Sequence, residues 1–360
     1  MRWVLALMVG LVAAQVTSPA LAQLHPTGRT VITQAVEDAI KPGFARFAEA
    51  ARDMRMAMGD LCDEPAESGL EAARERFRAV VVAWSRIELY RFGPLMTENR
   101  SERILFWPDR KGIALRQVQA ILANEDATAT EASTLKSKSV AVQGLGALEF
   151  VLFGSGAETL ATVDGDFRCG YGAAISGAVS EIAAEMSREW YADPGIASRM
   201  IRPNEGDPDY RDNAEVLQEL VGVMAHGVEM IRDQRILPFL GRDGAEPKPR
   251  SALFWRSNMT VPSILANFQG LETLLVNSAI WEYAPTEQFW IGEDAIAEFR
   301  KVAGEAAEVT ASVEEAVADP AQKAAIAAMV ESSQVLGKLT GEDLPAALGL
   351  SVGFSSLDGD

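Results

Sequence analysis

The side chain best suited to chemistry is Glu149, which interrupts an apolar segment over residues 143–154. Leu145, Leu148 and Leu152 recur at helical spacing, and Glu149 follows Leu145 by four positions. The carboxylate is therefore expected on or beside a buried helical stripe. Because an isolated carboxylate in a core is costly unless it is paired, hydrogen-bonded or protonated, two interpretations stay open. Glu149 is either a structural residue paired with an arginine or a carboxylate that lines a binding pocket.

Two glycines, Gly144 and Gly146, lie on the turn that precedes Glu149. Each glycine weakens a helix by roughly 1 kcal/mol relative to alanine. Their presence predicts that another backbone or a ligand approaches this turn closely.

The helix that carries Trp84 supplies a second group of candidate residues. Trp84, Glu88 and Arg91 share one helix face by their spacing. Arg86 or Arg91 is the natural partner for the Glu149 carboxylate. The alternatives are surface salt bridges for the arginines and core packing for the tryptophan.

Two long irregular stretches, 92–112 and 237–258, contain the remaining candidates, and long ordered loops in compact domains tend to be functional. The first contains Trp107 and Asp109. The second contains the run Trp255–Ser257, which suits an anion or carboxylate pocket, although loop packing explains it equally well. The predicted ligand site draws on all of these segments: Glu149, Arg91, Trp84, Asp109, Trp107, Trp255 and Arg256.

The apolar periodicity that must position these residues is helical almost throughout the chain. Alternating strand patterns bounded by tight turns are missing from the sequence. The sequence therefore predicts an all-α protein made of helical bundles. The expected helices cover these ranges: 44–54, 73–84, 113–123, 133–153, 170–191, 213–236, 260–280, 292–317 and 321–338.

We expect two helical-bundle domains, over 23–190 and 213–360, joined by a connection over 191–212. A Phe-Trp pair follows a glycine at the same spacing in each of them, at Phe106-Trp107 and at Phe254-Trp255. The similarity indicates either a degenerate duplication of one bundle or a coincidence.

The charge balance limits the classes of partner. The 360 residues include 51 acidic and 33 basic side chains, which gives a formal net charge of −18. This balance argues against nucleic acid and anionic lipid as partners, because both require clustered lysines and arginines. With two histidines and two cysteines, the chain also lacks the ligands for multi-histidine zinc sites, cysteine-rich zinc sites and iron–sulfur clusters.

Residues 1–22 have the pattern of a secretory signal peptide: Arg2 at the start, an apolar run over 3–14, and a cleavage site of small residues at Ala20–Ala22. A membrane anchor is the alternative, but the run is shorter than the ~20 residues that a span needs. No later stretch is long and apolar enough to span a membrane, so we expect an exported, periplasmic protein. Export makes Cys62 and Cys169 a candidate disulfide, with two buried free thiols as the alternative.

In their order along the chain, these motifs resemble those of the imelysin-like family of exported bacterial proteins. The resemblance spans most of the chain after residue 22. It implies two helical-bundle domains with a site between them, a cell-envelope location and an association with iron uptake. The founding member was described as a metallopeptidase. The segments that carry the resemblance are Arg91–Pro94, Phe106–Asp109, 144–154, Phe254–Ser257 and the tail over 353–360.

The family's signature is Gly-x-His-x-x-Glu. Gly144 and Glu149 match it, whereas Gly146 occupies the position of the histidine. Without the imidazole only oxygen donors remain, so we do not expect zinc-peptidase chemistry, which needs about three protein ligands and a base. An oxygen-only site made by Glu149 with Asp109 or Glu88 would suit a hard cation such as ferric iron or calcium.

The sequence therefore predicts a periplasmic binding protein associated with the uptake of iron or another metal, which captures a small ligand or metal ion between two helical bundles. Arginines would hold an anionic ligand, or carboxylates a hard cation. One alternative is a structural protein that braces a cell-envelope complex together with other iron-uptake components. The other is a metallopeptidase.

Overall fold

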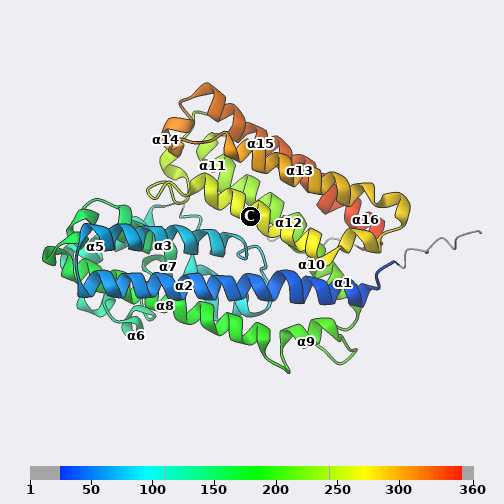
Figure 1. Cartoon of the computed structure of the whole chain (residues 1–360), viewed down its shortest axis with the longest axis horizontal. Coiled ribbons are helices and arrows are strands. Elements are labelled where there is room, and N and C mark those ends of the chain that lie inside the picture. Colours follow the sequence, from blue (N-terminus) through cyan, green and yellow to red (C-terminus); the bar gives the residue numbers. More distant parts are fainter. Residues whose placement is uncertain (1–24, 110, 243, 351–360) are drawn as a thin grey trace, which may run out of the picture.

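The structure, a computed structural model, describes residues 25–109, 111–242 and 244–350. Every regular element within these ranges is a helix, which confirms the prediction of an all-α fold (Figure 1). The predicted signal peptide over 1–22 and the tail motif over 353–360 lie outside the described residues. No helix among the described residues has the length and apolar character required to cross a bilayer.

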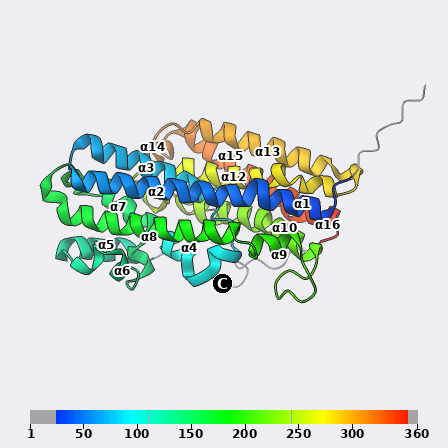
Figure 2. The same ribbon diagram turned by 60° about the horizontal axis from the view of Figure 1, so that its bottom comes forward.

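The N-terminal half, residues 25–190, is built on three long helices that run side by side (Figures 1 and 2). These are α2 (Lys41–Asp63), α3 (Glu67–Ser85) and α8 (Asp166–Tyr191). The disulfide Cys62–Cys169 joins α2 to α8, as predicted. The shorter helices of this half are α1 (Gly28–Gln34), α4 (Arg100–Ile104), α5 (Ile113–Asn124), α6 (Ala132–Leu135) and α7 (Gly144–Phe153).

The C-terminal half, residues 213–350, also contains long helices that lie side by side. They are α10 (Asn213–Met230), α12 (Thr260–Ser278), α13 (Trp290–Ala307) and α15 (Pro320–Lys338), with the short helices α11 (Leu237–Leu240), α14 (Val313–Ala316) and α16 (Leu344–Leu348). The connection between the halves contains α9 (Ile196–Ile201). Asp212 caps α10, because its side chain accepts a hydrogen bond from the Glu215 amide.

Three π-helical turns continue longer helices: η1 (Ala35–Ile40), η7 (Ile231–Ile236) and η11 (Leu339–Asp343). The first joins α1 to α2 in one continuous helical segment, whose beginning at α1 lies against α10 and α12 (Figure 1). The remaining short elements are 3₁₀ turns, of which η2 (Gly93–Asn99) and η8 (Pro249–Ser251) lie in the two irregular stretches.

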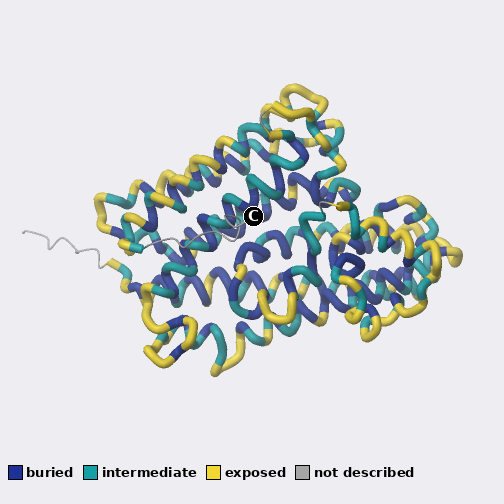
Figure 3. Tube along the Cα trace, turned by 180° about the vertical axis from the view of Figure 1, so that it is seen from behind, coloured by how far each residue is buried: buried dark blue, intermediate teal, exposed yellow. Residues whose placement is uncertain are grey.

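A single cluster of buried apolar side chains extends through both halves. The buried positions follow the inner faces of the helices, and the exposed positions follow their outer faces and the turns (Figure 3). The N-terminal half contacts the C-terminal half through α1 and η1 against α12 and through α3 against α12. The division into domains at 191–212 stays a prediction.

Two of the expected helices are broken. The range 133–153 contains α6, a 3₁₀ turn over 140–142 and then α7. The chain leaves the helix after Leu135, the backbone angles of Ser139 and Gln143 are non-helical, and α7 begins only at Gly144. The range 292–317 divides into α13 and α14, since Ser312 and Glu315 form a capping box that starts a new helix.

Candidate functional site

Glu149 lies on α7 and is 5% exposed, so it is a buried carboxylate as the sequence predicts. Its Oε1 atom accepts hydrogen bonds from the amide of Ser257, at 3.0 Å, and from the hydroxyl of the same residue, at 2.8 Å. Burial raises the pKa of Glu149, while these two hydrogen bonds and the charge of Arg256 act in the opposite direction. The carboxylate therefore joins α7 to the segment that precedes α12.

Arg256 supplies the positive charge that acts on the Glu149 carboxylate. Its guanidinium lies over the ring of Trp255 at 4.4 Å and over the ring of Phe150 at 5.4 Å. Burial lowers the pKa of Arg256, and the charge of Glu149 opposes this shift. The structure thus brings together three of the predicted site residues, Glu149, Trp255 and Arg256.

The expectation that Arg86 or Arg91 pairs with Glu149 is wrong. Arg86 donates a hydrogen bond to the side chain of Gln269 at 2.8 Å. Arg91 lies 3.8 Å from Glu102 and is largely exposed. Both arginines lie beyond the end of α3, where the chain turns toward the C-terminal half instead of toward α7.

Trp84 belongs to the core. It is 1% exposed, and its ring contacts Phe47 with 5.3 Å between ring centroids. Packing between α2 and α3 therefore explains its place in the sequence, and it does not line a described cavity.

Asp109 serves the start of α5. Its two carboxylate oxygens accept hydrogen bonds from the amides of Ile113 and Ala114, each at 2.8 Å. Asp109 accepts hydrogen bonds from the amides of α5, and Glu149 accepts them from Ser257, so the two carboxylates have separate partners. Among the residues that the structure describes, no group of three or more histidine, cysteine, aspartate or glutamate side chains is placed to hold a metal ion.

Glu88 is also buried, and its partners come from the C-terminal half. Arg235 donates to one of its oxygens at 2.6 Å, and the side-chain amide of Asn267 donates to the other at 2.8 Å. The same amide donates to the carbonyl of Ser85 at 2.6 Å. This cluster fastens the end of α3 to η7 and α12.

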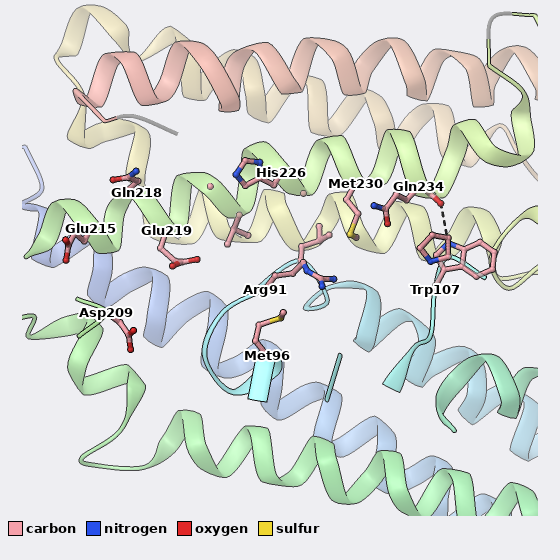
Figure 4. A pocket seen from close by; sticks show the side chains of 15 residues that line it. Arg91, Met96, Trp107, Asp209, Glu215, Gln218, Glu219, His226, Met230 and Gln234 are labelled. Carbon is pink, nitrogen blue, oxygen red and sulfur yellow. Dashed lines mark hydrogen bonds between the residues drawn. The ribbon is translucent and has the colours of Figure 1, made fainter. Parts of the chain in front are cut away.

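The largest described cavity has a volume of about 750 Å³ and lies between α10 and the segment over 89–108, at the meeting of the two halves (Figure 4). Of the predicted site residues, Arg91 and Trp107 line it. The indole nitrogen of Trp107 donates to the carbonyl of Gln234 at 3.3 Å, which fixes one wall. The lining includes Arg91, Met96, Trp107, Asp209, Glu219 and Met230.

The acidic end of this cavity contains one carboxylate without a protein partner. Asp209 pairs with Arg199, and Glu215 pairs with Arg211. Glu219 makes no hydrogen bond or ion pair with any of the described residues, although it is partly buried (Figure 4). Burial, followed by the charge of Asp209, raises the pKa of Glu219. Glu219 is thus a carboxylate available to a ligand.

The other end of the cavity is cationic and apolar. Arg91 extends into it together with Met96, and Met230 lies between Arg91 and Trp107 (Figure 4). Methionine and tryptophan side chains form an adaptable apolar surface. The cavity therefore offers opposite charges at separate places, with an apolar wall beside one of them.

Sequence reasoning missed the contribution of α10. Its periodicity is that of an ordinary amphipathic helix. The available signal was a pair of helical glycines, Gly222 and Gly227, on either side of His226, and all three line the cavity. At Gly222 a larger side chain would extend into the cavity, whereas at Gly227 a Cβ atom would press on Leu271 and Leu89.

The sequence of this chain is similar to those of known proteins. The model of the imelysin family matches residues 40–337. This chain belongs to the imelysin family. Among curated proteins, iron-regulated protein A of Synechococcus elongatus is 28% identical to the imelysin-family chain over 92 residues, which is 25% of this chain and 26% of that relative. The match thus spans about a quarter of the relative's length.

Solved structures share the fold of this imelysin-family protein. An imelysin-like protein from Psychrobacter arcticum is 18% identical and superimposes with a TM-score of 0.74, covering 91% of this chain and 97% of the other. A putative iron-regulated protein A precursor from Parabacteroides distasonis is 13% identical, with a TM-score of 0.70 and the same two coverages, 91% and 97%. At these identities the likeness establishes the architecture alone.

The signature segment of the imelysin family forms the start of α7 here. A Cβ atom at Gly144 would collide with the backbone carbonyl of Ile104, so the predicted close approach of another backbone is confirmed at this glycine. Gly146 is exposed, and a Cβ atom there would meet nothing. Gly146 therefore lies on the surface of α7, open to solvent.

Proposed function

We propose that this imelysin-family protein is a binding protein that holds a small ligand in the 750 Å³ cavity between its halves. The observation that carries the proposal is the unpartnered carboxylate of Glu219 in a cavity of the size that small-molecule sites have, roughly 300–1,000 Å³. Because Glu219 is partly buried, its carboxylate would attract a cationic group of a ligand more strongly than a fully exposed carboxylate would.

The donor set favours a small molecule or a metal chelate over a bare metal ion. A hard cation takes about six oxygen ligands, and the described part of the chain gathers no group of three candidate ligands. A molecule with a cationic group near Glu219, an anionic group near Arg91 and an apolar body on Met96 and Met230 matches the walls. Recognition without covalent chemistry follows from such contacts.

The association with iron comes from relatives and is part of the proposal. Two similar proteins carry the description iron-regulated protein A, one in a cyanobacterium and one in Parabacteroides distasonis. We place the protein in the periplasm because residues 1–22 have the pattern of a signal peptide. There it would work beside other components of iron uptake in the cell envelope.

Titration calorimetry with two ferric chelates of opposite charge, ferrioxamine B and ferric citrate, tests the proposal, with free ferric iron, calcium and zinc alongside. We expect saturable binding of a chelate that Glu219→Gln weakens at least about tenfold, or 1.4 kcal/mol. Gly222→Leu is expected to weaken it similarly, because a side chain there has only the His226 ring within 4 Å and grows into the cavity.

Glu181→Gln is the matched control, because Glu181 is exposed on α8 and does not line the cavity. Absence of heat with every probe, combined with native mass spectrometry that finds no bound molecule in protein purified without chelators, would overturn the proposed function. An equal loss of affinity in Glu181→Gln would overturn the assignment of the ligand to this cavity.

A further inference from the structure

A second cavity, of about 350 Å³, lies between α2 and α3 and is bounded on one side by Met259 of the C-terminal half. It shares no lining residue with the first cavity. Its polar lining is mainly cationic and includes Arg46, Arg78 and Arg86. In a protein whose net charge is −18, arginines gathered around a cavity require an explanation.

One of these arginines is neutralised by protein carboxylates. Arg78 pairs with Glu75, another lining residue, at 3.1 Å and with Glu71 at 3.0 Å. Glu75 is therefore already paired with a cation. Glu75 and Glu71 therefore compensate the charge of Arg78. Arg46 and Arg86 are the two cations of the lining that no carboxylate among the described residues pairs with.

Arg46 and Arg86 repel each other and have no carboxylate between them. Burial and then the positive charge of Arg46 lower the pKa of Arg86. The Nη2 atom of Arg86 donates to the neutral side chain of Gln269, and its Nε–H is buried without an acceptor in the described part of the chain. Arg46 is exposed and forms no ion pair with a described residue, so the orphaned donor of the partly buried Arg86 carries the argument. An anion would relieve the repulsion and satisfy the orphaned donor.

The apolar residues of the lining indicate which kind of anion the cavity would bind. Val82, Ala83 and Met259 present hydrocarbon to the cavity, and the volume lies near the lower limit for small-molecule sites. Inorganic phosphate has no apolar part to place against these residues. A guanidinium fork matches the two oxygens of a carboxylate.

We propose that the cavity between α2 and α3 binds a small organic carboxylate, with its carboxylate group held by Arg46 and Arg86 and its short hydrocarbon chain against Val82, Ala83 and Met259. This site is independent of the cavity assigned to the proposed function. Its occupation would link the N-terminal half to Met259, at the residue that precedes α12.

Calorimetry at low ionic strength with hexanoate tests the site, and inorganic phosphate and hexylamine serve as comparison probes. Hexanoate is expected to bind saturably, phosphate at least about tenfold more weakly, and hexylamine not at all. Added salt should weaken the binding of hexanoate, because exposed charge interactions are screened.

Arg86→Gln and Arg46→Gln should each weaken hexanoate at least about tenfold. Ala83→Leu keeps both arginines, fills the cavity and should have a comparable effect. The control is Arg76→Gln on α3, because Arg76 is exposed, pairs with Asp53 at 3.9 Å and does not line the cavity.

Circular dichroism of each variant establishes that it is folded before calorimetry. No heat with hexanoate in the wild-type protein would overturn the site. Phosphate or hexylamine binding as tightly as hexanoate would overturn the chemical class, and equal weakening by Arg76→Gln would overturn the location.

Discussion

Ser257 donates two hydrogen bonds to the same oxygen of Glu149, across 108 positions of the chain. The Ser257 hydroxyl also lies 3.1 Å from the carbonyl of Phe254, so it has a second acceptor. When Glu149 is protonated, its O–H can donate to the hydroxyl oxygen while the hydroxyl donates to Phe254. Both protonation states therefore have a satisfied arrangement, and burial decides which is favoured.

Replacing Glu149 with glutamine is expected to change the pH dependence of stability. Because burial raises the pKa of Glu149, the folded protein binds the proton more tightly than the unfolded chain does. The wild-type protein therefore loses stability as the pH rises from the ordinary glutamate pKa through the raised one. Glu149→Gln removes this loss, so its free energy of unfolding should improve relative to wild type between about pH 4 and about pH 8.

Urea denaturation at these two pH values measures the difference. The matched control is Glu181→Gln, since Glu181 is an exposed carboxylate and its removal should leave the pH dependence unchanged. If Glu149→Gln became less stable relative to wild type as the pH rose, the charge of Arg256 would outweigh burial and the argument would be wrong.

The two signature glycines should respond oppositely to alanine. Gly144 has a φ of +74°, and a Cβ atom there would collide with the Ile104 carbonyl, so Gly144→Ala is expected to lower the free energy of unfolding by at least about 2 kcal/mol. Gly146 lies in a helix with open space around it, so Gly146→Ala should raise it by about 0.5–1 kcal/mol. Chemical denaturation of both variants checks the pair. Similar effects in the two variants would contradict the distinction.

The disulfide between Cys62 and Cys169 should contribute strongly to stability. It closes a loop with a sequence separation of 107, and removing such a cross-link costs about 2–5 kcal/mol. We expect the double variant Cys62→Ala/Cys169→Ala to unfold at a lower denaturant concentration by that free energy. Wild-type protein measured with a reductant is the control and should match the double variant. A loss below about 0.5 kcal/mol would show that α2 and α8 hold together without the bond.

The sequence predicts most of the fold because helical periodicity is a local signal. The repeat of apolar positions gives α5 and α12 close to their observed limits, whereas it finds only the first half of α2 and the last two thirds of α3. It fails within 133–153, where the chain leaves the helix between Leu135 and Gly144 and where the Ile104 backbone approaches Gly144 closely. Local periodicity contains no information on that approach.

The candidate site was predicted less well because it depends on which distant segments meet. The spacing around Glu149 correctly placed its carboxylate in the interior, but Ser257 and Arg256 took the role expected of Arg86 or Arg91. The spacing of residues along one helix shows which face is buried, but it does not show which distant segment packs against that face. The cavity wall from α10 was missed for the same reason, since Glu219 reads as an ordinary exposed position until the segment over 89–108 lies against it.

The buried ion pair between Glu88 and Arg235 should be the most sensitive link between the halves. Glu88→Ala leaves Arg235 buried with its 2.6 Å partner gone, so we expect the free energy of unfolding to fall by about 3–5 kcal/mol. The double variant Glu88→Leu/Arg235→Met removes both charges and should cost much less. Arg232→Met is the neighbouring control, because its pair with Asp233 is partly exposed and is worth under about 1 kcal/mol. Urea denaturation in which the double variant lost as much free energy of unfolding as Glu88→Ala would contradict the argument, because the loss would then not come from an uncompensated buried charge.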